Sequence, residues 1–163
     1  MILGMDWFTL THVVISLIGI AAGLVLLLAL MSGRNPANWA AWFLIFTTLT
    51  SVTGFLFHNA HVTPAQIVGA ISLIALFLAA YALYARGLTG LWRDIYVITV
   101  TLGLYLNVFV LVVQAFAKIP ALHALSPGLP PSGPAFLATQ LVVLAIFLLA
   151  GWRAFRAFKP MKF

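Results

Sequence analysis

The chain is dominated by long apolar runs that carry almost no charge. The first run, from about Trp7 to Met31, contains no Lys, Arg, Asp or Glu, and four similar runs follow it. A helix crosses the apolar core of a bilayer, about 30 Å thick, with roughly 20 consecutive apolar residues. The sequence therefore predicts an all-α polytopic membrane bundle of five transmembrane helices in a single domain, residues 1–163. The expected helices cover about 7–31, 39–57, 64–86, 91–118 and 135–152.

The overall composition agrees with a membrane protein. Of 163 residues, 64% are hydrophobic and 6% are charged, whereas about a quarter of the residues in a soluble domain are charged. Eight Lys or Arg residues against two acids give a net charge of +6. Because the basic residues lie in the links between apolar runs, they indicate membrane topology, and we expect no nucleic-acid partner. The absence of cysteine excludes disulfides and thiolate metal sites.

Two segments mark helix boundaries. Thr63, Pro64 and Gln66 form the pattern of a capping box with Pro at the first helical position, which predicts the start of the third helix. Pro120 is expected to stop the fourth helix, and a long loop with paired prolines leads to the fifth.

The distribution of basic residues predicts the orientation. Positively charged residues are enriched in short cytoplasmic loops. One side of the five-helix arrangement collects Arg34, Arg86, Arg93, Arg153, Arg156, Lys159 and Lys162. Lys118 falls on the other side. We therefore expect a cytoplasmic C-terminus and an external N-terminus, in a bacterial inner membrane.

Polar residues form stripes on three of the expected helices. Residues at i, i+4, i+7 and i+11 share one helix face. The stripes are His12, Ser16, Gly19, Gly23; Thr47, Ser51, Gly54, His58; and Asn107, Leu111, Gln114, Lys118. Because unpaired polar groups are costly in lipid, these faces are expected to point at one another inside the bundle. The candidate ligand-binding residues are His12, Ser51, His58, Asn107, Gln114 and Lys118.

A purely structural interpretation of the same residues stays open. Small residues such as Gly19 and Gly23 allow close helix packing, and Asn107 and Gln114 can bond between helices. Lys118 can extend to the outer headgroups or pair with Asp6, the acid nearest to it in the topology.

The four histidines, His12, His58, His61 and His123, are all expected at the external end. His58 and His61 have a spacing that lets two imidazoles share a Zn or Cu ion, with His12 or His123 as a third ligand. His12 and His58 could instead be the axial ligands of a haem b. Neutral, hydrogen-bonded histidines and a proton relay are the remaining interpretations.

Four strings resemble a family of small bacterial integral inner-membrane proteins of unassigned function. They are TSVTGFLFH (Thr50–His58), PAQIVGAISLIAL (Pro64–Leu76), GLWRDIYVITV (Gly90–Val100) and LYLNVFVLVVQAFAKIPALHAL (Leu104–Leu125). The resemblance covers about 39–140 and implies an inner-membrane location without an activity. Relatives often carry an acidic residue before the paired prolines, where this chain has Leu129.

The sequence leaves several functions open. It has no paired carboxylates, no Gly-rich phosphate loop and no Ser–His–Asp set, so whether the chain is an enzyme stays undecided. The first interpretation is an outward-facing polar pocket that binds or relays a small ligand, ion or proton. The second is an accessory subunit or assembly factor, which docks against partner membrane subunits or forms a homo-oligomer. The third is a haem- or metal-binding redox protein.

Overall fold

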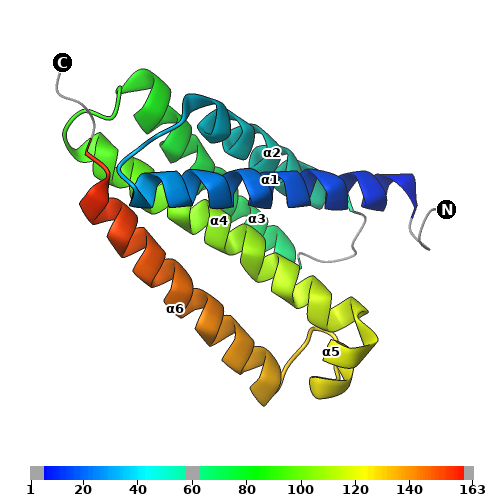
Figure 1. Cartoon of the computed structure of the whole chain (residues 1–163). Helices are drawn as coiled ribbons and strands as arrows, with labels where there is room; N and C mark the ends of the chain where they lie inside the picture. The colour runs from blue at the N-terminus through cyan, green and yellow to red at the C-terminus, as the bar shows by residue number, and fades with distance from the viewer. Residues whose placement is uncertain (1–5, 58–62, 160–163) are drawn as a thin grey trace.

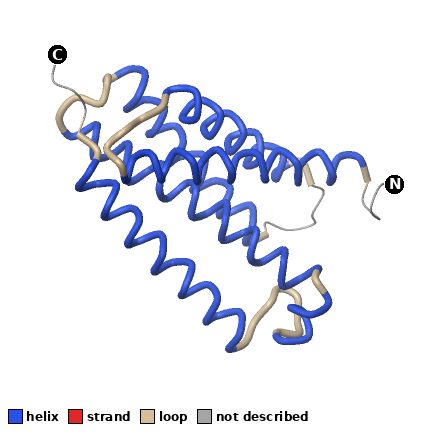
Figure 2. The backbone as a smooth tube through the Cα atoms, viewed as in Figure 1, coloured by secondary structure: helices blue, strands red, loops and turns tan. Residues whose placement is uncertain are grey.

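The computed structural model describes residues 6–57 and 63–159, and this part of the chain forms helices joined by short loops, with no strand (Figures 1 and 2). The elements are α1 (Trp7–Met31), α2 (Ala37–Phe55), α3 (Pro64–Ala80), the π-helical turn η1 (Tyr81–Ala85), α4 (Leu91–Lys118), α5 (Pro120–Leu125) and α6 (Pro134–Ala157). The predicted all-helical class is confirmed.

Four helical segments of the described chain are long and apolar enough to cross a membrane: Trp7–Met31, Pro64–Ala85, Leu91–Lys118 and Pro134–Ala157. The expected second span, α2, is a helix of 19 residues but is not among these four. Its sequence includes Asn38 together with several Thr and Trp residues, which lowers its apolar content. The crossing by α2 stays a prediction.

Most helix boundaries follow local signals in the sequence. The capping box of α3 is confirmed, because Thr63 Oγ1 accepts from Gln66 N at 3.3 Å and Gln66 Oε1 accepts from Thr63 N at 2.9 Å. Pro120 follows the end of α4 at Lys118, as expected, and it occupies the first turn of a short helix, α5, within the expected outer loop. α6 runs five residues further than expected, to Ala157.

The helices extend between two ends of the molecule. α1 begins at the end where α4 finishes, and α6 finishes near the end where α4 begins (Figure 1). We call the first the outer end and the second the inner end, in keeping with the predicted orientation. Arg86, Arg93 and Arg156 belong to the inner end, and Lys118 to the outer end.

The core is centred on Phe43 of α2, which is fully buried. A Cβ at Gly23 of α1 would lie 2.7 Å from Phe43 Cδ2 and 2.6 Å from Leu104 Cδ1 of α4. A Cβ at Gly103 would lie 3.6 Å from Phe43 Cζ and 3.4 Å from Leu76 Cδ2 of α3. The two glycines thus let four helices meet around one aromatic ring.

α4 contacts every other described helix, whereas α6 lies at the margin of the bundle. The buried residues of α6 are Gln140, Phe147 and Ala154, a row at a spacing of seven. In its last third, a Cβ at Gly151 would lie 2.9 Å from Thr101 Cγ2 of α4. The remaining surface of α6 is largely apolar and exposed.

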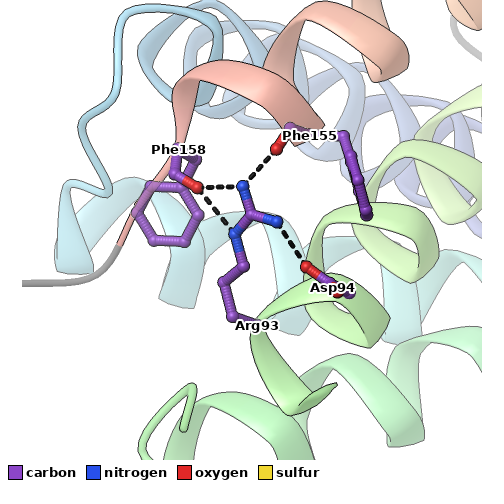
Figure 3. A network of polar contacts seen from close by, with 4 residues as sticks. All are labelled: Arg93, Asp94, Phe155 and Phe158. Carbon is purple, nitrogen blue, oxygen red and sulfur yellow. Dashed lines mark hydrogen bonds and ion pairs between the residues drawn. The ribbon is translucent and has the colours of Figure 1, made fainter. Parts of the chain in front are cut away.

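The inner end is fastened by Arg93 (Figure 3). Its guanidinium forms an ion pair with Asp94 and donates to the carbonyl oxygens of Phe155 and Phe158 at the end of α6. Such charge-assisted bonds satisfy carbonyls that a helix end leaves free. Close by, the buried Tyr96 donates from its hydroxyl to Asn35 Oδ1 at 3.0 Å.

Candidate functional site

The imidazole of His12 joins α1 to α2 near the outer end. Its Nδ1 lies 2.7 Å from Thr53 Oγ1. The ring also meets Phe57 edge-on, with centroids 5.1 Å apart. Gly54 leaves room for the ring, because a Cβ at that position would lie 3.8 Å from His12 Cε1. The stripe prediction that His12 faces α2 is confirmed.

The hydrogen bonds of Thr53 indicate which ring nitrogen of the neutral His12 carries the hydrogen atom. Thr53 Oγ1 donates its single proton to the carbonyl of Leu49 at 2.7 Å, with Thr50 O at 3.2 Å as a second acceptor. With its proton directed to Leu49 O, the hydroxyl oxygen can accept from His12 Nδ1–H, and on this basis we assign the hydrogen atom of the neutral ring to Nδ1. This arrangement leaves Nε2 as the free ring nitrogen, an acceptor in the neutral ring and a donor in the protonated ring.

Lys118 lies in the last turn of α4, at the outer end of the molecule. The ammonium group is exposed, and Gln114, one turn earlier, is exposed as well. The prediction that the whole α4 stripe faces the bundle is therefore wrong for Leu111, Gln114 and Lys118, and holds for Asn107. The buried face of α4 has moved to Phe116, whose ring packs against Phe136 of α6 at 5.5 Å.

The inner parts of the stripes are buried as predicted. Gly19 of α1 lies against α2, where an added Cβ would be 3.0 Å from Thr47 Oγ1 and 3.2 Å from Thr47 N. Ser51 and Asn107 are 8% exposed, and Thr47 is 1% exposed. These helices are therefore closely packed at mid-height, and polar atoms lie inside the contact.

Two surface hollows lie away from this face. One, of about 360 Å³, is lined by Phe55, Gln66, Ile67, Ala70, Ile71 and Ile74 between α2 and α3. The other, of about 280 Å³, is lined by Asn38, Trp39 and Trp42 at the start of α2. None of the candidate ligand residues lines either hollow.

The metal and haem predictions depend in part on residues that the structure does not describe. His58 and His61 lie outside the described residues. Within 6–57 and 63–159, no group of three or more His, Cys, Asp or Glu side chains could hold a metal ion. His123 lies in α5, and its Nδ1 is buried without a hydrogen-bond partner among the described residues.

Asp6 does not pair with Lys118, so that prediction is wrong. Its carboxylate instead caps α1, accepting from Thr9 N at 2.8 Å and from Thr9 Oγ1 at 3.0 Å. These bonds hold the pKa of the exposed carboxyl below its ordinary value of 3.8. The ion pair found within the described residues is Arg93 with Asp94.

Sequence reasoning missed Thr53 as a partner of His12. It is off the predicted stripe, although it is only one residue from Gly54 on that stripe. It also missed Arg93 and Tyr96, whose partners lie more than 60 positions away in the chain. A sequence pattern within one helix does not reveal such distant partners.

Comparison of the chain with protein-family models, curated proteins and solved structures finds no match. The arguments about function therefore rest on the chain's own residues.

Proposed function

We propose that the chain is a five-span protein of a bacterial inner membrane that binds a small carboxylate- or carbonyl-bearing molecule at its outer end. One observation carries this proposal. Thr53 of α2 holds the ring of His12 on α1, and Lys118 ends α4 at the same end of the bundle, so basic groups from helices distant in the sequence gather at this end (Figure 1).

The chemistry of these groups favours a ligand that accepts hydrogen bonds. The Lys118 ammonium has three donors and no acceptor, and no acidic side chain pairs with it in the described part of the chain. His12 offers Nε2 at the same end of the bundle. Gln114, exposed one turn below Lys118 on α4, adds an amide that can donate to or accept from the same molecule. Asn107 and Ser51 lie deeper and support the walls of the site.

The proposed topology is supported by charge and by the course of the helices. α1 starts and α6 finishes at opposite ends of the molecule (Figure 1), which an odd number of crossings requires. The Arg residues of the inner end give this end the excess positive charge expected on the cytoplasmic side. In the proposed topology, His12 and Lys118 face the external side.

The test measures ligand-induced thermal stabilisation of the purified protein in nanodiscs. The probes are acetate, inorganic phosphate and a short-chain benzoquinone. A molecule that binds only the folded state raises stability by about 2.7 kcal/mol at a hundredfold excess over Kd. We expect one probe to give a saturable rise in Tm that Lys118→Met and His12→Phe abolish. Lys159→Met, an exposed cation near the inner end, should retain the rise.

Two outcomes would overturn the proposal: no probe shifts Tm, or the shift persists in Lys118→Met. An absorption spectrum and a metal analysis of the same sample address the redox alternative. A Soret band would favour a haem held by His12 and His58, and stoichiometric Zn or Cu would favour a metal site that includes His58 and His61.

An accessory or self-associating role is the second candidate, and the exposed apolar surface of α6 favours it. This helix buries only one row of side chains, which leaves room for a partner helix in addition to lipid. Because the chain has no cysteine, Ala145→Cys on the exposed side of α6 can be tested for disulfide cross-linking between copies. Ile74→Cys on the exposed side of α3 is the matched control.

A further inference from the structure

Four helices contribute to a buried polar layer at mid-height, which we define as Gly19, Thr47, Ser72 and Asn107. The layer lies one helical turn toward the outer end from the contacts around Phe43. In each helix, four residues separate the two levels: Gly23 and Gly19, Phe43 and Thr47, Leu76 and Ser72, and Gly103 and Asn107. The close approach of Gly19 to Thr47 Oγ1 confirms that α1 and α2 share this level.

The layer is well shielded from the surface. Thr47 is 1% exposed, Ser72 4% and Asn107 8%, and Gly19 is buried. Yet Thr47 Oγ1 and Asn107 Nδ2 have no hydrogen-bond partner among the residues that the structure describes. A buried polar group without a partner costs several kcal/mol in an apolar environment. Each of these two atoms, at one level of the bundle, is therefore able to bond with a small polar molecule.

The hydroxyl of Thr47 differs from those of other threonines in these helices. Thr50, Thr53, Thr101 and Thr139 each donate to the carbonyl four residues earlier in their own helix. This local bond removes the cost of burying a hydroxyl. Thr47 does not form this local bond. Its hydroxyl oxygen lies in the contact between α1 and α2, opposite Gly19, which has no side chain.

We propose that the polar layer binds water that enters from the outer end and stops at Phe43. Water fits the chemistry because it accepts from the Asn107 amide and both donates to and accepts from the Thr47 hydroxyl. The layer contains no charged group to bind an ion. Ser51, one turn further out, and then His12 with Thr53 continue the polar groups toward the outer end.

On the inner side, the contact between Phe43, Gly23 and Leu104 closes the path. Phe43 and Leu104 are both fully buried, and their atoms would lie under 3 Å from a Cβ at Gly23. The polar layer is therefore the deepest point of a hydrated half-path, and no pore crosses the bundle. The polar layer uses the same helix faces as the proposed outer site, but its hydration does not require the side chains of His12 or Lys118. Hydration of the layer and ligand binding at the outer end can therefore be tested separately.

Water-edited solid-state NMR of the wild-type protein in bilayers tests the hydration directly. The rate of magnetisation transfer from water to the side chains of Thr47 and Asn107 should be at least about tenfold higher than the rate of transfer to the side chain of Thr99. Thr99 is the matched control, because it is 7% exposed and its hydroxyl already donates to Ile95 O at 2.7 Å. A transfer to Thr47 as slow as that to Thr99 would overturn the proposal. Transfer that is unchanged in Lys118→Met would separate this result from the outer ligand site.

The direction of entry is tested with single cysteines, which the cysteine-free chain permits. A small methanethiosulfonate reagent added at the outer side of oriented vesicles should modify Ser51→Cys and Thr47→Cys. Leu49→Cys, close to Thr47 in height but exposed to lipid, and Leu44→Cys, buried nearer the inner end, should react at least about tenfold more slowly. Reaction of Thr47→Cys from the inner side, reaction of Leu44→Cys as fast as Thr47→Cys, or no reaction at all would overturn entry from the outer end.

Discussion

Arg93 Nε of α4 donates to the main-chain oxygen of Phe158 at 2.6 Å, so a side chain from the start of one helix closes the end of another. The same guanidinium reaches the carbonyl of Phe155 and the carboxylate of Asp94. A planar group with several fixed donors can serve all three acceptors at once.

We expect Arg93→Met to lower the free energy of unfolding by about 1.5–3 kcal/mol, the usual value for a hydrogen bond to a charged group. Arg93→Lys should recover little of this loss, because an ammonium cannot reproduce the fork of donors. The measurement is the thermal midpoint in detergent. Arg34→Met, which removes an exposed cation, is the control. Equal midpoints for the two Met variants would contradict the prediction.

Gly23→Ala should be less stable than Gly54→Ala by about 1–3 kcal/mol, the typical cost of overfilling a packed core. Both changes gain the helix propensity of alanine. At Gly23 the new methyl group would lie 2.6 Å from Leu104 Cδ1, whereas at Gly54 its nearest neighbour is His12 Cε1 at 3.8 Å. Chemical denaturation of the two variants in mixed micelles compares them, and similar stabilities would show that the Phe43 contacts are not tight.

The start of α1 should loosen only in strong acid. The pKa of Asp6 is held below its ordinary value of 3.8 by the bonds from Thr9. A carboxyl group with a lowered folded pKa stabilises fully above its unfolded value and loses this effect as pH falls through the folded value. NMR of the Thr9 amide across this range should therefore show its hydrogen bond lost below pH 3.8. The Gln66 amide, capped by the hydroxyl of Thr63, should not change with Asp6 titration.

If α2 crosses the membrane, Ser32→Cys and Ala65→Cys will react with an impermeant maleimide from opposite sides. Ser32 precedes α2, and Ala65 lies in the first turn of α3. The apolar side chains that α2 exposes, such as Ile45 at 55%, have the character of a lipid-facing surface. Lys159→Cys and Leu129→Cys serve as inner and outer references. Labelling of Ser32→Cys and Ala65→Cys from the same side would reduce the number of crossings to four.

Much of the helical framework could be predicted from the sequence, because long apolar runs and local caps act over a few residues. The capping box at Thr63 and the contact of His12 with α2 are examples. The exposure of Gln114 and Lys118 could not be predicted in this way. One face of a helix stays buried only where the same neighbouring helices pack against it. The buried side of α4 changes between Asn107 and Phe116, whose ring packs against Phe136 of α6.

The sequence also could not predict that Thr47 Oγ1 has no hydrogen-bond partner among the described residues. In the sequence this residue is one of several threonines, each able to bond to its own helix. In the structure its hydroxyl lies against Gly19 of another helix, a contact that exists only in the folded bundle.

α4 contacts every other described helix, so it is the central helix of the bundle. Its half nearer the inner end packs against α1, α2 and α3, and its other end packs against α5 and the start of α6. The buried side turns by about half the circumference between Asn107 and Phe116, since each residue advances about 100° around a helix. Because Lys118 and Asn107 both belong to α4, a rotation of this helix about its long axis would move both groups at once. Such a rotation would couple the position of Lys118 at the outer end to that of Asn107 in the polar layer.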